Sequence, residues 1–161
     1  MEINTFKTTA TDHFEAGNQL RQAGDLAGAI AAYQAAFNCE QSNFSYPHHL
    51  GEVLLKLGDL EGAIVHFQLA IRLNPHFSWS HHFLGEAFAR NGQVAEAEQA
   101  FRQAIALNST CSWSYYGLAE VLAAQNQFQA RSTATVDRSN YILISIDRIT
   151  VCETYSVGTG S

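Results

Sequence analysis

A repeat of 34 residues is the feature that most constrains how this chain can fold. The segment HHLGEVLLKLGDLEGAIVHFQLAIRLNP begins at His48, and HFLGEAFARNGQVAEAEQAFRQAIALNS begins one period later at His82. The same frame extends back to FEAGNQLRQAGDLAGAIAAYQAAFNCEQ and forward to YGLAEVLAAQNQFQAR. Such a period indicates one supersecondary unit per repeat, each stacked on its neighbours. The four units begin at about Ala10, Phe44, Ser78 and Ser112.

Each unit has the apolar periodicity of two amphipathic helices joined by a short polar turn. The expected turns are Gly24-Asp25, Gly58-Asp59, Asn91-Gly92-Gln93 and Asn126-Gln127. Small residues recur where two helices would cross, and an aromatic residue follows in the second helix. They are Gly17, Gly51, Gly85 and Ala119, then Ala29, Ala63 and Ala97, with the aromatic residues Tyr33, Phe67 and Phe101. This alternation of large and small side chains predicts stacked helical hairpins.

These motifs resemble the tetratricopeptide repeat family, whose units carry a Leu-Gly pair, a Gly-Asp-like turn, an Ala, an aromatic residue, a second Ala and a closing Asn-Pro. The second unit matches at Leu50-Gly51, Gly58-Asp59, Ala63, Phe67, Ala70 and Asn74-Pro75. The third unit has Ser109 in place of the proline, and the first has Ala16 for the leucine and Gln41 for the proline. The resemblance covers about residues 10–127 and implies an all-α, right-handed superhelical array of antiparallel helix hairpins.

The domain organisation expected from this frame is a lead, an array and a tail. The lead is 1–9, the array is 10–131 with repeats 10–43, 44–77, 78–111 and a partial repeat 112–131, and the tail is 132–161. The helical pattern stops at Arg131, so a second helix in the fourth unit is not expected. The tail segments YILISI and ITVCETY are typical of short strands. The tail either begins a further domain, covers the last helix or is a non-native sequence.

The resemblance also implies which residues line the concave groove, because this family exposes one face of each first helix there. Positions spaced by three and four residues share that face. The predicted groove residues are Asn18, His48, Glu52, Lys56, Trp79, His82, Glu86, Arg90, Trp113, Tyr116 and Glu120. His81 falls at a position that packs between the two helices of a unit. The pair His81-His82 is therefore one rung of a repeated pattern and not an isolated site.

The groove chemistry favours a protein or peptide partner. Glu52, Glu86 and Glu120 form a row of carboxylates, and Trp79 and Trp113 stand at its rim. Aromatic area with carboxylates selects Arg, Lys or backbone N–H donors. Chaperone-binding members of the family hold a terminal carboxylate with a Lys/Asn/Arg clamp that is reduced here to Asn18, Lys56 and Arg90, which disfavours acidic C-terminal peptides. Alternatively, the glutamates only pair with His or Arg along their own helix.

Composition excludes several other classes of function. The net charge of −6 and the lack of any Lys/Arg cluster argue against nucleic acid. No stretch reaches the roughly 20 apolar residues of a membrane-spanning helix, and no secretory signal is visible. Cys39, Cys111 and Cys152 are odd in number and widely spaced, which favours the cytoplasm.

No catalytic residue, cofactor or metal site is expected. There is no nucleophile motif and no Gly-rich phosphate loop. A metal site from His48, His82, Glu52 and Glu86 is disfavoured because no HExxH or comparable close set occurs. The predicted function is therefore an interaction scaffold that binds a peptide or protein segment. The alternatives are the recruiting N-terminal region of a larger enzyme, such as a glycosyltransferase or methyltransferase, and self-association through the tail.

Overall fold

The structure is a computed structural model that describes residues 9–134, and these residues form helices joined by short turns. The helices are α1 (Ala10–Ala23), α2 (Leu26–Cys39), α3 (Ser45–Leu57), α4 (Leu60–Leu73), α5 (Ser78–Arg90), α6 (Val94–Leu107) and α7 (Ser112–Ala134). None of the described helices combines the length and apolar character needed to cross a bilayer. The tail was predicted to span 132–161, and the last residues of α7 are its first three residues. The strands and the self-association predicted for the tail lie outside the described residues.

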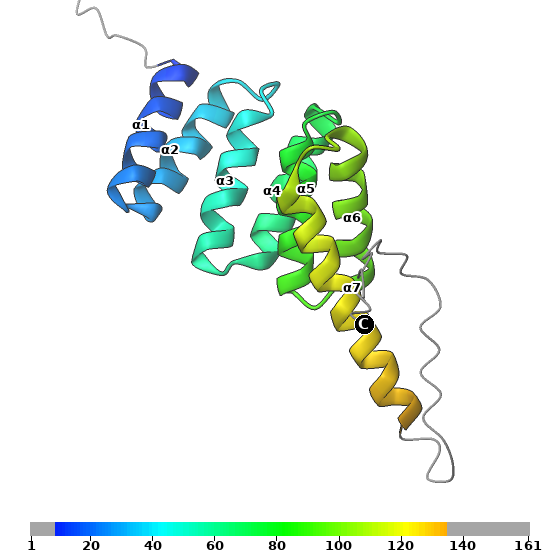
Figure 1. The fold of residues 1–161 in the computed structure, drawn as a ribbon. Helices are drawn as coiled ribbons and strands as arrows, with labels where there is room; N and C mark the ends of the chain where they lie inside the picture. The colour runs from blue at the N-terminus through cyan, green and yellow to red at the C-terminus, as the bar shows by residue number, and fades with distance from the viewer. Residues whose placement is uncertain (1–8, 135–161) are drawn as a thin grey trace, which may run out of the picture.

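The helices stack in chain order from α1 to α7 (Figure 1). The pairs α1/α2, α3/α4 and α5/α6 pack as hairpins, and each hairpin contacts the next through α2/α3, α4/α5 and α6/α7. The first helices of successive units also meet, in the contacts α3/α5 and α5/α7. The predicted all-α array of helical hairpins is confirmed.

The Gly-Asp turns stop one helix and start the next. Gly58 has a left-handed φ of 82°, which a side chain would disfavour, and it ends α3. Asp59 then caps α4 by accepting a hydrogen bond from the backbone N–H of Gly62 at 2.9 Å. Gly24-Asp25 repeats this arrangement between α1 and α2. Two adjacent residues thus fix both the end of one helix and the direction of the next.

The core depends on one close contact within each hairpin. A Cβ atom added to Gly51 would lie 2.8 Å from the ring of Phe67, which is fully buried. The pairs Gly17–Tyr33 and Gly85–Phe101 repeat this contact in the first and third units. Without a side chain at glycine, the aromatic ring packs directly on the backbone of the facing helix. The crossings predicted from the sequence are therefore as close as glycine permits.

The turn predicted at Asn126-Gln127 is wrong. Helix α7 continues through both residues and beyond residue 131 to Ala134. The three earlier turns each have a glycine with positive φ, whereas the equivalent fourth position is Asn126, which follows Ala123, Ala124 and Gln125 and precedes Gln127. Gln and Ala favour helix, so nothing in the local sequence forces the chain to stop. Within the described residues, α7 has no second helix of its own.

Gly51→Ala should lower the free energy of unfolding, because the new methyl group would overlap the Phe67 ring. Overpacking costs about 1–3 kcal/mol, and alanine returns about 1 kcal/mol through its higher helix propensity, which leaves a net loss of up to about 2 kcal/mol. Urea unfolding followed by circular dichroism measures this loss. With Phe67→Leu as partner, the double variant should lose less than the sum of the single variants. A Gly51→Ala chain as stable as the native one would contradict the close contact.

Candidate functional site

A pocket of about 340 Å³ lies between α5 and α7, where the first helices of the third and fourth units face each other. It brings together five of the eleven predicted groove residues. Its lining consists of His82, Glu86, Ala89 and Arg90 from α5, Phe101 from α6, and Trp113, Gly117, Glu120 and Val121 from α7. Phe101, Gly117 and Val121 were not predicted as site residues, although Phe101 was recognised as an aromatic core residue.

Glycine and two aromatic residues shape the apolar part of this region. A Cβ atom on Gly117 would lie 2.5 Å from the Phe101 ring, so the absence of a side chain lets α7 close on α6. On the same helix the Trp113 side chain is 66% exposed and lines the pocket. Tyr116 is 62% exposed but does not line it. The pocket therefore has a buried aromatic wall and an exposed indole at its rim.

The pocket carries two carboxylates in different surroundings. Glu86 lies 3.7 Å from the guanidinium of Arg90, which also donates a 3.0 Å hydrogen bond to the backbone carbonyl of Leu55. Glu120 is exposed, and its carboxylate raises the pKa of Tyr116 through a hydrogen bond and its charge. Burial lowers the pKa of His82, which leaves this imidazole neutral at pH 7. The lining consequently has two acidic groups: the charge of Glu86 is paired with Arg90, and the charge of Glu120 is not paired with a cation among the described residues.

His82 also links two units. Its Nδ1 lies 3.1 Å from the hydroxyl of Ser114 in the next unit, and His48 Nδ1 lies 3.0 Å from Ser80 in the same relation. The two pairs are related by the repeat, because His82 and Ser114 lie one period after His48 and Ser80. Each imidazole therefore fixes the position of the following first helix through one buried or half-buried hydrogen bond. His81 is half-buried, and its Nε2 lies 3.0 Å from the carbonyl of Pro75.

His48, which was predicted to line the groove, is buried. The residue is only 4% exposed, because its ring lies against Ser80 and Phe83 of the next unit and against Phe77, which precedes α5. Its partner Glu52 is also sheltered, with 16% of its side chain exposed. The equivalent His82 is half-buried, because Cys111 and Gly117 stand at the positions where Phe77 and Phe83 pack on His48. The same position in the repeat thus has different exposure in different units.

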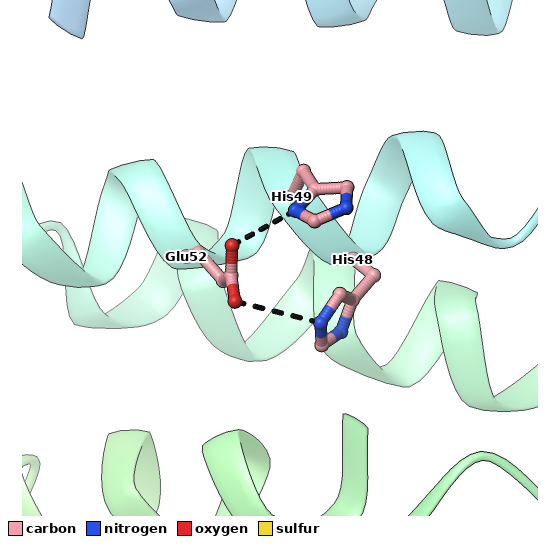
Figure 2. Close-up of side chains that lie close together, drawn as sticks. All are labelled: His48, His49 and Glu52. Atoms are coloured by element: carbon pink, nitrogen blue, oxygen red, sulfur yellow. Dashed lines mark hydrogen bonds and ion pairs between the residues drawn. The ribbon is translucent and has the colours of Figure 1, made fainter. Parts of the chain in front are cut away.

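Glu52 sits in a cluster that the groove prediction did not anticipate. It contacts His48 Nε2 at 3.6 Å, His49 Nδ1 at 2.9 Å and Arg21 Nη1 at 3.5 Å (Figure 2). Burial acts to raise the pKa of Glu52, but the hydrogen bonds and charges of the two histidines outweigh it and hold the pKa well below its usual range. His49 was missed as a partner, although its spacing of three residues from Glu52 is a detectable signal.

The remaining predicted groove residues lie outside the pocket. Asn18 accepts a 2.8 Å hydrogen bond from the Tyr33 hydroxyl, and Lys56 is exposed on α3. Trp79 is 37% exposed, and its ring packs against His82 with centroids 5.5 Å apart. Together with His48, Glu52 and Tyr116, these residues make up the six predicted positions that do not line the pocket.

Ser80, His48 and Glu52 lie in the order of the nucleophile, base and acid of a catalytic triad. They cannot act as a triad. Ser80 is completely buried, so its hydroxyl cannot reach a substrate. The His48 ring uses Nδ1 for Ser80 and directs Nε2 toward Glu52. The series consists of one buried hydrogen bond between two units, from Ser80 to His48, and a longer contact between His48 and Glu52, with a structural role.

Stacked hairpins of this geometry define a helical-repeat protein. The sequence matches the family described as TPR repeat over residues 51–92 and the one described as Tetratricopeptide repeat over residues 79–111. Residues 51–111 thus consist of tetratricopeptide repeats, as their motifs predicted. No curated protein matches the chain by sequence.

Several solved structures share the fold, among them two TPR domains. The first TPR of Spaghetti (RPAP3), bound to the HSP90 peptide SRMEEVD, is 19% identical with a TM-score of 0.72, covering 73% of this chain and 94% of that one. The second TPR domain of human RPAP3, in complex with the HSP70 peptide SGPTIEEVD, is 23% identical with a TM-score of 0.68 and coverages of 70% and 93%. MamA is 27% identical with a TM-score of 0.69, and the match covers 72% of this chain and 63% of MamA.

Ser80→Ala should destabilise the array, because the variant leaves Nδ1 of the buried His48 without its partner. An unsatisfied buried polar group costs about 1–3 kcal/mol, and urea unfolding measures the loss. Ser112→Ala, which removes an exposed hydroxyl from the neighbouring helix α7, is the matched control and should change the free energy of unfolding by less than about 0.5 kcal/mol. Equal losses in the two variants would show that the hydrogen bond between the units contributes nothing.

The lowered pKa of Glu52 makes a specific contribution to acid stability. A folded-state pKa below the ordinary value of 4.5 stabilises the fold above that pH, and the contribution is lost as the pH falls from 4.5 toward the folded pKa. Between pH 5 and pH 3, the native chain should therefore lose more stability than a Glu52→Gln chain does. Glu15→Gln removes an exposed carboxylate and should keep the native pH dependence. Parallel pH profiles for the native and Glu52→Gln chains would contradict the assignment.

Proposed function

We propose that this array binds a protein or peptide segment along the face of its first helices, and that the pocket between α5 and α7 anchors a basic side chain of that segment. The observation that carries the proposal is the combination of an exposed indole, Trp113, with a solvent-facing carboxylate, Glu120, at one pocket. An indole face attracts a cation, and a carboxylate forms charge-assisted hydrogen bonds with Lys or Arg.

The charges of the pocket favour a cation over an anion. Arg90 is held by Glu86 and by the carbonyl of Leu55, so its positive charge is already partnered. Glu120 keeps its charge, and the neutral His82 adds none. An incoming carboxylate would meet one free acid and one paired acid, which is unfavourable. The same two carboxylates would attract the positive charge of a Lys or Arg side chain. A backbone N–H could also donate a hydrogen bond to them.

The segment bound here should differ from those of the structural neighbours. The two RPAP3 domains are described with the peptides SRMEEVD and SGPTIEEVD, which are rich in acidic residues. In this chain, the pocket presents Glu86 and Glu120 to its ligand. We therefore infer a shared mode of interaction, with a segment lying on the helical face, and a reversed charge preference. The proposal gives the repeats no catalytic role.

We place this interaction in the cytoplasm. Cys39 and Cys111 have no disulfide partner among the described residues, which fits a reducing compartment.

A peptide library tests the anchor. The full chain should enrich peptides with a Lys or Arg at one dominant position, and replacing that residue by Gln should weaken binding. Trp113→Ala and Glu120→Gln should each weaken the selected peptides by about 1–2 kcal/mol, or five- to thirtyfold in Kd. Fluorescence anisotropy measures the affinities, and added salt should reduce them.

Two controls separate the pocket from the rest of the face. Trp79→Ala removes an indole of the same face outside the pocket and should change the affinity less than Trp113→Ala does. Arg90→Gln should strengthen the binding of a basic peptide, because it removes the competing positive charge beside Glu86. Enrichment of acidic peptides, or equal affinities for native, Trp113→Ala and Glu120→Gln chains, would overturn the proposal.

A further inference from the structure

Three side chains on a single turn of α3 direct nitrogen and oxygen atoms to one point. Figure 2 shows the rings of His48 and His49 turned toward the two oxygens of Glu52. His49 Nδ1 lies 2.9 Å from Oε2, and His48 Nε2 lies 3.6 Å from Oε1. One potential ligand atom from each residue lies within 4.8 Å of the other two. The spacings of three and four residues put both histidines within reach of the glutamate along the helix.

This set of atoms suits a divalent transition metal. Neutral imidazole nitrogen and carboxylate oxygen are ligands for Zn²⁺ at about 2.0–2.2 Å, which puts ligand atoms about 3.3 Å apart in a tetrahedral site. The separations between the two rings and the carboxylate are already close to that value. The expectation that the chain has no metal site rested on the absence of HExxH. The structure shows that the spacing His-His-x-x-Glu also brings three ligands together.

The surroundings of His48 hold its ring in place. Its Nδ1 is hydrogen-bonded to Ser80, and its ring packs edge-on against Phe77 with centroids 5.0 Å apart. Such a hydrogen bond on the far nitrogen fixes the orientation of a metal-binding imidazole and leaves Nε2 for the ion. His49 stacks on Tyr33 with centroids 5.8 Å apart. Both rings are therefore held by groups outside the cluster, which reduces the cost of ordering the ligands.

Arg21 is the group that opposes a cation here. Its Nη1 lies 3.5 Å from Glu52 Oε2, and its side chain is 26% exposed. The guanidinium and a metal ion would compete for the same carboxylate. Part of the Arg21 side chain faces solvent, and its head would have to turn outward when an ion enters. If the cluster is a metal site, removing the Arg21 guanidinium should strengthen zinc binding. If the cluster is only an ion pair, removing Arg21 should not strengthen zinc binding.

We propose that His48 Nε2, His49 Nδ1 and the Glu52 carboxylate bind one divalent transition-metal ion of the Zn²⁺ class, with water completing the coordination. The site lies on α3, away from the pocket between α5 and α7, and does not depend on the proposed peptide binding. The ion would clamp one turn of α3 and, through Ser80, tie it to α5.

Metal titration of the full chain tests this site. The protein should carry no histidine tag, and Cys39→Ser should be the background because Cys39 is exposed and could bind zinc itself. After chelator treatment and desalting, isothermal titration with ZnCl₂ should show one ion per chain, and the melting temperature should rise with zinc. Cobalt, as a spectroscopic substitute, should give the visible absorption bands of a four- or five-coordinate ion.

The variants separate a metal site from an ion pair. His49→Phe keeps an aromatic ring against Tyr33 but removes a ligand, and Glu52→Gln removes the charge; each should weaken zinc binding at least tenfold. His76→Asn, at an exposed histidine, should bind as the parent does. Arg21→Gln should bind zinc more tightly than the parent, although it loses the ion pair. This last variant keeps all three ligands, so it remains informative if a ligand variant fails to fold.

Three results would overturn the proposal. The first is a parent chain that takes up no zinc. The second is uptake that His49→Phe and Glu52→Gln leave unchanged while both chains keep a native circular dichroism spectrum. The third is an Arg21→Gln chain that binds zinc no more tightly than the parent.

Discussion

The close contact between a glycine on one helix and an aromatic ring on the next is the constraint on which the rest of this structure depends. Where Phe67 packs on Gly51, the two helices of a hairpin approach as closely as a backbone and a ring allow. That contact fixes the distance and the register within a unit, and its repetition fixes the position of every following unit. The pocket is a consequence, because Gly117 brings α7 onto the same Phe101 ring that closes the third hairpin.

Hydrogen bonds from histidine to serine add a second level of order, between units. His48 and His82 occupy the same position in the repeat, and each bonds a serine of the next first helix. A sheltered imidazole nitrogen with one hydrogen-bond partner tolerates little displacement, since losing that partner leaves a polar group unsatisfied. The glycine contacts therefore set the spacing inside the hairpins, and the histidines align one hairpin with the next.

The functions that we propose for this array depend on departures from the repeat. The three glutamates of the ladder share one position, but Glu52 is enclosed by Arg21 and two histidines, Glu86 faces Arg90, and Glu120 is open to solvent. Their chemistry differs accordingly: the first forms a compact group of metal-binding type, the second is neutralised, and the third retains a free charge beside an indole. The proposed metal site and the proposed peptide pocket thus use the same repeat position in different units.

The sequence by itself determined the class of fold, the hairpin turns at Gly24, Gly58 and Gly92, and the glycine and aromatic positions of the core. These follow from local rules, since a left-handed turn requires glycine and a close crossing requires a small residue at a fixed spacing. Only the tertiary structure decided that His48 is buried, that His49 joins Glu52, and that five groove residues meet at one pocket. Burial and partnership depend on what the neighbouring units place over each residue, and the position within a repeat carries no information about those neighbours.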